Sequence, residues 1–217
     1  MTVGAWTPLH EPIFLDVEED ILCSLLKIPT IPRQVSFEEI PFTSSNFESM
    51  TPPRREQHAA GRYCLYSIIN KAGIQNGKVA ETFPLKIQTN RGIKPMSISH
   101  SDSFAVAVLG LIHKSIGVDI EHKDREISSS ILDQFCSCDE IRQLINTRSN
   151  EKLEMWMIKE AVSKATGQGM SIAKEVEIVG DNAYYQSSVF RIIRREYNDH
   201  KIIIALDYSD SSIDNLT

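Results

Sequence analysis

The sequence lacks the features that mark membrane and secreted proteins. No run of 18 apolar residues occurs in its 217 residues, so we expect no membrane span. The first residues contain no basic segment followed by an apolar stretch, which argues against secretion and predicts a cytoplasmic protein. There are four cysteines, and Cys136 and Cys138 form a CxC pair without the second pair or the histidines of a zinc site. We therefore expect four reduced thiols.

Several familiar catalytic and binding motifs are also missing. The chain contains no Walker loop, no GxGxxG and no ordered Ser-His-Asp set. The sequence therefore does not support nucleotide binding by such a loop or the catalytic triad of a serine hydrolase. Its isoelectric point is about 5.5 and no nucleic-acid recognition motif is present. We expect no nucleic-acid partner.

The charges are separated along the chain. Residues 1–53 carry a net charge of −6, residues 54–114 carry +6 and residues 115–217 carry −6. Two surfaces that attract each other would give this pattern. A site for a polyanion and a metal ion would give it as well, with cations for the phosphates and carboxylates for the metal.

The hydrophobic patterns predict a mixed α+β protein with antiparallel sheet. Thr51, Pro52 and Pro53 indicate the start of a helix over residues 54–72, which Gly73 ends. Ser137 and Glu140 have the spacing of a capping box. We further expect a helix over 16–26, a helix from about 150 to 166, and a hairpin of strands 103–111 and 115–121 joined across His113 and Lys114. Shorter strands are expected at 85–88 and 96–99, and three more at 176–179, 187–197 and 201–208.

Asp119 and Glu121 are two residues apart on a predicted strand, so both carboxylates point to one face. Ile116, Val118 and Ile120 would then lie in the core on the other face. Such a pair is often only the solvated edge of a sheet. The alternative is a site for Mg²⁺, which prefers carboxylate and phosphate oxygens.

A second group of candidates lies on the predicted helix near residue 160. Trp156, Glu160 and Lys164 follow one stripe of that helix, which is apolar at its start and ionic at its end. A surface ion pair between Glu160 and Lys164 explains the spacing without any function, and would contribute about 0.3–0.5 kcal/mol. A metal ligand at Glu160 is the functional alternative.

A third group is basic. Arg55, His58 and Arg62 share a helix face, and cations in a first helical turn are easier to understand if an anion binds there. Arg91 and Lys94 would extend this basic surface. A separate hydroxyl-rich segment, Ser97–Ser101, carries His100.

Four segments follow one another along the chain: Arg54-Arg55-x-x-His58-x-x-Gly61-Arg62, Ser97-Ile98-Ser99-His100-Ser101, Ile116-Gly117-Val118-Asp119-Ile120-Glu121 and Trp156-x-x-Lys159-Glu160-Ala161-x-x-Lys164. In this order they resemble the motifs of the Sfp-type 4′-phosphopantetheinyl transferases, over roughly residues 52–180. The first segment is most similar to the branch that serves enterobactin-type siderophore synthetases. Met157 departs from the Ser, Cys or Thr that is usual in the last motif.

The resemblance implies an enzyme that binds coenzyme A and Mg²⁺. It would move the phosphopantetheine arm onto a serine of an apo acyl, aryl or peptidyl carrier protein in siderophore or non-ribosomal peptide synthesis, releasing adenosine 3′,5′-bisphosphate. It implies metal ligands at Asp119, Glu121 and Glu160, with Glu160 taking the serine proton directly or through water. Catalytic support would come from Lys159 and Lys164. The coenzyme contacts so implied are Arg55, Arg62, Arg91, Lys94, Ser99, His100, Asp119, Lys159 and Lys164.

The resemblance also implies the fold, which is two similar α+β halves, each a small antiparallel sheet packed on helices. We place the division between residues 113 and 114, with a basic coenzyme A half before it and the metal carboxylates and catalytic helix after it. Such a chain would act as a monomer. Two other functions stay open: a non-catalytic binder of coenzyme A or of a carrier, and a Mg²⁺-dependent phosphohydrolase.

Overall fold

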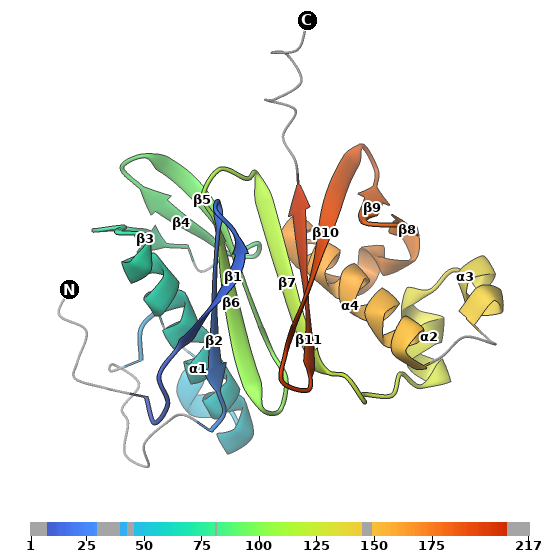
Figure 1. Ribbon diagram of the computed structural model, residues 1–217, viewed down its shortest axis with the longest axis horizontal. Coiled ribbons are helices and arrows are strands. Elements are labelled where there is room, and N and C mark those ends of the chain that lie inside the picture. Colours follow the sequence, from blue (N-terminus) through green and yellow to red (C-terminus); the bar gives the residue numbers. More distant parts are fainter. Residues whose placement is uncertain (1–7, 30–39, 43–45, 81, 145–148, 208–217) are drawn as a thin grey trace, which may run out of the picture. The chain divides into compact units, whose positions relative to one another are not determined.

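The computed structural model describes residues 8–29, 40–42, 46–80, 82–144 and 149–207 (Figure 1). The chain forms two compact units, an N-terminal unit of Met1–Leu111 and a C-terminal unit of Ile112–Thr217. Each unit contains an antiparallel sheet packed on helices, which confirms the predicted α+β class. The functional division that we predicted at residues 113 and 114 stays a prediction.

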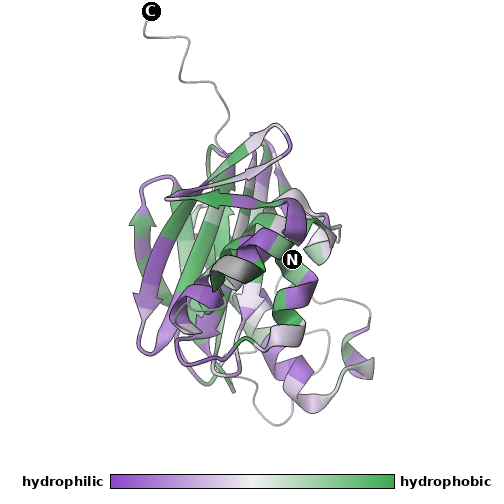
Figure 2. Cartoon of the chain, turned by 90° about the vertical axis from the view of Figure 1, so that its right-hand side faces the viewer, coloured by the Kyte–Doolittle hydropathy of each residue, from purple (hydrophilic) through white to green (hydrophobic). Residues whose placement is uncertain are grey.

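The N-terminal unit holds a sheet with the strand order β1-β2-β6-β5-β4-β3. Helix α1 packs on β2, β5 and β6, and a short 3₁₀ helix η2 precedes it. Long stretches of the strands are hydrophobic, whereas hydrophilic residues recur along the helices and turns (Figure 2). The elements are β1 (Ile13–Glu18), β2 (Ile21–Lys27), η2 (Phe47–Ser49), α1 (Pro52–Lys71), β3 (Lys78–Val79), β4 (Lys86–Thr89), β5 (Gly92–His100) and β6 (Phe104–Gly110).

The helix that we predicted over residues 16–26 is wrong, because this segment forms the antiparallel strands β1 and β2. Ser24, Leu25 and Leu26 are all fully buried, so both faces of β2 are covered. A strand buried on both faces gives a continuous apolar run, which periodicity alone does not distinguish from a helix. The pairing of β2 with β6, some 80 residues later in the chain, decides the outcome.

Helix α1 begins and ends as predicted. Prolines occupy its first two positions, and Gly73 beyond its end has a φ of 65°, the left-handed conformation that glycine adopts readily. Within the helix, a Cβ placed on Gly61 would lie 2.6 Å from Cγ2 of Ile98. The absence of a side chain at Gly61 therefore lets α1 approach β5 closely.

The C-terminal unit holds a sheet with the strand order β7-β11-β10-β9-β8. Helix α4 lies against β7 and β11 (Figure 1). The elements are β7 (Ser115–His122), α2 (Ser129–Phe135), α3 (Cys138–Leu144), α4 (Ser149–Thr166), the 3₁₀ helix η3 (Gly169–Glu175), β8 (Glu177–Val179), β9 (Asn182–Tyr185), β10 (Ser188–Tyr197) and β11 (His200–Asp207).

The predicted hairpin across His113 and Lys114 is also wrong. Strand β7 pairs with β11, while β6 pairs with β2 and β5. The two strands are adjacent in sequence but belong to different sheets. The packing of the whole sheet determines which strands pair through hydrogen bonds. The next strand in the sequence is only the most common partner.

Strand β7 alternates as predicted. Ile116, Val118 and Ile120 are buried on one face, and Gly117, Asp119 and Glu121 share the other. A Cβ on Gly117 would lie 1.8 Å from the carbonyl oxygen of Ala161 and 2.7 Å from the nitrogen of Ala165. Glycine is therefore required for the backbone of β7 to approach that of α4.

Ahead of α4, the capping box of α3 is present as predicted. Ser137 N donates to Glu140 Oε2 at 2.7 Å, and Glu140 N donates to Ser137 Oγ at 3.3 Å. Phe135 at the end of α2 is 1 % exposed and packs on Trp156, so it is a core residue.

The four cysteines are free thiols. In the described part of the chain, no helix is long and apolar enough to cross a membrane.

Substituting Gly117 with Ala tests the close contact of β7 and α4. We expect Gly117→Ala to lower the free energy of unfolding by about 2–3 kcal/mol or more, because the new methyl meets backbone atoms that have little freedom to move. Urea unfolding of the full chain measures this change, with Glu177→Ala on the exposed side of β8 as the control. Equal stability of Gly117→Ala and the control would contradict the proposed contact.

Candidate active site

Strand β7 and helix α4 bring three of the predicted residues together. Lys164 Nζ lies 2.8 Å from Asp119 Oδ1 and 3.9 Å from Glu160 Oε2. Asp119 is 4 % exposed, and the side chains of Glu160 and Lys164 are about one-fifth exposed. The contact at Gly117 explains this arrangement, because Asp119 is the next residue on the same face of β7.

Arg125 joins this cluster, and the sequence interpretation missed it. Its guanidinium donates to a carboxylate oxygen of Glu121, and its Cζ lies 5.9 Å from the ring centroid of Trp156. The only sequence signal for Arg125 is its position four residues after Glu121. We call Asp119, Glu121, Arg125, Glu160 and Lys164 the carboxylate cluster.

Burial and mutual repulsion shape the charges of this cluster. Burial, followed by the nearby Asp119 carboxylate, raises the pKa of Glu121 to about 7, although Arg125 and Lys164 oppose the change. Burial is also the main cause of the raised pKa of Glu160. The Lys164 ammonium lowers this pKa, and the Asp119 carboxylate raises it. Both carboxyls therefore hold a proton more readily than an exposed glutamate does.

The donor chemistry of the cluster suits a hard divalent cation. Among the described residues, no group of three or more His, Cys, Asp or Glu side chains is arranged to hold a metal ion as it stands. Asp119, Glu121 and Glu160 nevertheless offer only carboxylate oxygens, the donors that Mg²⁺ prefers. Burial is the main cause of the raised pKa values of Glu121 and Glu160, and the Asp119 carboxylate adds to both. A divalent cation would relieve this repulsion between the carboxylates. The residues therefore fit such an ion.

A basic cluster lies at the start of α1 in the N-terminal unit. Arg54 donates a hydrogen bond to Nε2 of His100 on β5. Burial, together with the charges of Arg62, Arg54 and His100, lowers the pKa of His58 to about 4. We call Arg54, His58, Arg62 and His100 the basic cluster. Like charges gathered this way favour an anion.

Arg55 does not join the basic cluster. Its Nε donates to the Met50 carbonyl at 3.0 Å, and its guanidinium pairs with Glu48 at 3.7 Å. Arg54 takes the place that we expected for Arg55, because Arg54, His58 and Arg62 follow the i, i+4, i+8 spacing of a helix face.

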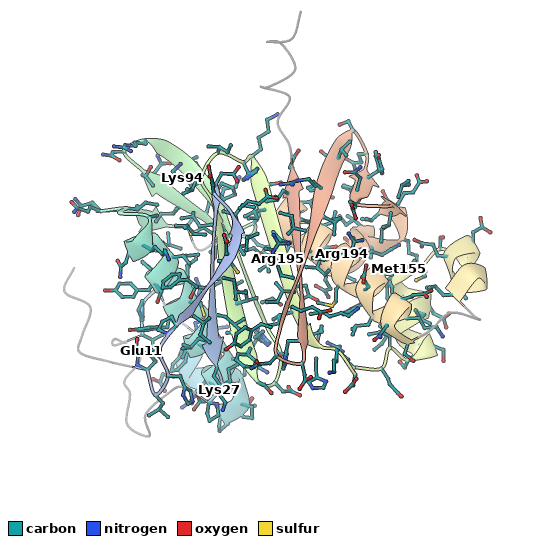
Figure 3. All side chains as sticks on the ribbon, viewed as in Figure 1. Glu11, Lys27, Lys94, Met155, Arg194 and Arg195 are labelled. Atoms are coloured by element: carbon teal, nitrogen blue, oxygen red, sulfur yellow. The ribbon has the colours of Figure 1, made fainter. Side chains whose placement is uncertain are left out.

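The remaining candidates of the N-terminal unit lie on or near β5. Lys94 Nζ donates to the Leu111 carbonyl at 2.5 Å (Figure 3 labels Lys94). Arg91 is exposed in the turn before β5, and its backbone N–H donates to Thr89 Oγ1 at 3.0 Å. Ser99 is 6 % exposed, one residue before His100.

Lys159 is placed differently from Lys164. It is 0 % exposed, and its ammonium contacts the carbonyls of Phe135 and Ala173 and the carboxylate of Glu140. The structure therefore does not bring Lys159 to the carboxylate cluster. Its predicted contact with a phosphate stays a prediction, which this geometry does not favour.

The comparison with known families addresses the C-terminal unit. Residues 115–202 match the 4′-phosphopantetheinyl transferase superfamily. No curated protein matches the chain. The matched segment is less than half of the chain and contains the whole carboxylate cluster, whereas the basic cluster lies outside it.

The superfamily match supports phosphopantetheinyl transfer in general, and the mixed α+β fold agrees with it. It also indicates coenzyme A and carrier proteins as the kind of molecules involved. The roles of individual residues stay predictions.

The lowered pKa of His58 predicts a pH dependence of stability. Between pH 6.5 and 4 the unfolded chain binds a proton at this position that the folded chain does not bind. Stability is therefore lost as the pH falls through this range, by at most about 3 kcal/mol from this residue. In His58→Gln we expect a flatter profile of unfolding free energy against pH.

Urea unfolding at pH steps between 4 and 7.5 measures this effect. His10→Gln is the matched control, since His10 belongs to the same unit but not to the basic cluster. Parallel profiles for the wild type and His58→Gln would contradict the electrostatic account.

Proposed function

We propose that this protein transfers the 4′-phosphopantetheine arm of coenzyme A to a serine of an apo carrier protein. The observation that carries the proposal is the meeting of Asp119, Glu160 and Lys164 within the segment that matches the superfamily. Four motifs in the expected order, two of them outside that segment, add support. The proposed products are a holo carrier protein and adenosine 3′,5′-bisphosphate.

The proposed reaction is an attack of the serine hydroxyl on the pantetheine-side phosphorus of the coenzyme pyrophosphate. A serine O–P bond forms, and the bond between that phosphorus and the bridging oxygen breaks. The bridging oxygen leaves with the adenosine bisphosphate, and the serine proton passes to the Glu160 carboxylate. Glu160 would take this proton directly or through a water, as a general base.

Positioning and charge neutralisation supply most of the catalysis in such a transfer. Mg²⁺, which Asp119, Glu121 and Glu160 would hold, would neutralise charge on the pyrophosphate. Lys164, paired with Asp119 at 2.8 Å, is placed to do the same with its ammonium.

The basic cluster is our candidate for the phosphates of coenzyme A. Arg54 and His100 are hydrogen-bonded to each other, and Arg62 acts on the same His58 ring. Arg91, Lys94 and Ser99 remain candidates for further contacts, and Arg55 is the least favoured because Glu48 and Met50 hold it. The siderophore or non-ribosomal peptide pathway, and a cytoplasmic monomer, are proposed from the sequence alone.

Incubation with coenzyme A and Mg²⁺, with and without an apo peptidyl carrier protein, tests the activity. We expect the carrier to gain the mass of the phosphopantetheine arm. Consumption of coenzyme A without the carrier would indicate a phosphohydrolase. Binding of coenzyme A without either reaction would indicate a non-catalytic binder, and both results contradict our proposal.

Removing one carboxylate of the cluster should abolish transfer. We expect Glu160→Gln and Asp119→Asn each to fall below about a tenth of the wild-type rate, a barrier increase above about 1.4 kcal/mol. Glu154→Gln is the matched control, because Glu154 is on α4 but pairs with Arg194 at 2.7 Å. A folded Glu160 or Asp119 variant that stays above a tenth would refute the role assigned to that residue.

The affinity for coenzyme A should fall with salt, because cations bind its phosphates. We expect Arg62→Ala to weaken binding about tenfold at low salt, and Arg195→Ala in β10 to change it little. Arg195 is the matched control, because it is an arginine of β10 that lies outside the positively charged residues 54–114. Equal calorimetric effects of the two variants would mean that the positive charge of residues 54–114 serves another purpose.

A further inference from the structure

Lys159 is a fully buried ammonium with a complete set of partners. Its Nζ contacts the Phe135 carbonyl at 3.2 Å, the Ala173 carbonyl at 2.8 Å and a Glu140 carboxylate oxygen at 2.7 Å. A lysine ammonium has three N–H donors, and these three acceptors can use all of them. Without such partners a buried charge of this kind would be strongly unfavourable.

The three acceptors come from three different segments. Phe135 ends α2, Glu140 lies in α3 and Ala173 lies in η3, so the ammonium of Lys159 joins all three to α4. Glu140 has a second task, because its carboxylate also accepts from Ser137 N in the capping box. The start of α3 and the anchor on α4 therefore share one carboxylate.

Lys159 and Lys164 cannot share a helix face. Five residues along an α-helix turn through about 140° beyond a full circle. Lys164 points to Asp119 and Glu160, and its side chain is 19 % exposed, whereas that of Lys159 is enclosed. Only Lys164 is placed to contact a phosphate at the carboxylate cluster.

The segment that Lys159 holds leads back to the carboxylate cluster. The ring of Phe135 meets that of Trp156 edge to face, with 4.9 Å between centroids. Trp156 in turn lies beside Arg125, which binds Glu121. Phe135, Trp156 and Arg125 thus form a continuous line of packing from the Lys159 anchor to a carboxylate of the cluster.

We propose that Lys159 is a positioning residue, which through Glu140 fixes the segment of α2 and α3, residues 129–144, beside the carboxylate cluster. The consequence is that the fixed segment shapes the surface where the carrier protein presents its serine. This consequence rests on the proposed function. It assigns no phosphate contact to Lys159.

Coenzyme A binding separates positioning from phosphate contact. Calorimetry on Lys159→Met and Lys164→Met compares two changes that remove an ammonium from the same helix. We expect Lys164→Met to weaken coenzyme A binding at least tenfold and Lys159→Met to change it less than threefold. Equal weakening by the two variants would overturn the proposal.

Steady-state kinetics test the consequence for the carrier. In Lys159→Met we expect the KM for the apo carrier to rise at least fivefold while the KM for coenzyme A stays within twofold. An unchanged carrier KM, or a rise in both KM values together, would contradict the inference. Glu154→Gln on the same helix is again the control.

A third measurement does not depend on activity, and it tests the inference even if Lys159→Met fails to fold. Glu140→Gln keeps the size of the side chain but removes its charge. Hydrogen–deuterium exchange should then be faster in residues 129–144 and 169–175, and unchanged in α1 of the other unit. Unchanged exchange in residues 129–144 would overturn the inference.

The three measurements also separate this inference from the proposed function. If the wild-type protein binds no coenzyme A and modifies no carrier, the proposed function fails, and the exchange of Glu140→Gln alone still decides whether Lys159 and Glu140 fix the segment. If transfer occurs and the exchange is unchanged, only the inference fails.

Discussion

The close approach of β7 and α4 at Gly117 is the constraint on which the candidate active site depends. A side chain at this position would overlap the Ala161 carbonyl, so the two backbones can meet only at a glycine. Asp119, the next residue on that face of the strand, is thereby brought to Lys164 at 2.8 Å. Glu160 lies one helical turn before Lys164, and its carboxylate is 3.9 Å from the same Lys164 ammonium. A helix and a strand packed at an ordinary distance would leave these side chains further apart.

Charge is the second organising feature, and it differs between the two units. The C-terminal unit gathers three carboxylates with Lys164 and Arg125, and burial raises the pKa of Glu121 and Glu160. The N-terminal unit gathers cations at the start of α1, and burial with their repulsion lowers the pKa of His58. The first arrangement suits a divalent cation and a proton acceptor, and the second suits phosphates.

The two lysines of the predicted catalytic motif lie on different sides of α4 and have different contacts. Lys164 contacts Asp119 and Glu160, while Lys159 contacts α2, α3 and η3. A motif that contains both therefore does not give both the same role. Lys159 contacts Phe135, Phe135 packs on Trp156, and Trp156 lies beside Arg125. These contacts connect α2, α3 and η3 to the carboxylate cluster.

The sequence by itself determined the features that depend on local chemistry. It predicted the prolines and the glycine that bound α1, the capping box of Ser137 and Glu140, and the alternation that puts Asp119 and Glu121 on one face, because each rests on residues a few positions apart. Only the tertiary structure decided that residues 13–27 are strands, that β7 pairs with β11, that Arg54 rather than Arg55 meets His100, and that Lys159 is enclosed. Each of these depends on a partner far away in the sequence, and an apolar run or a charged residue is compatible with several partners until the whole chain has packed.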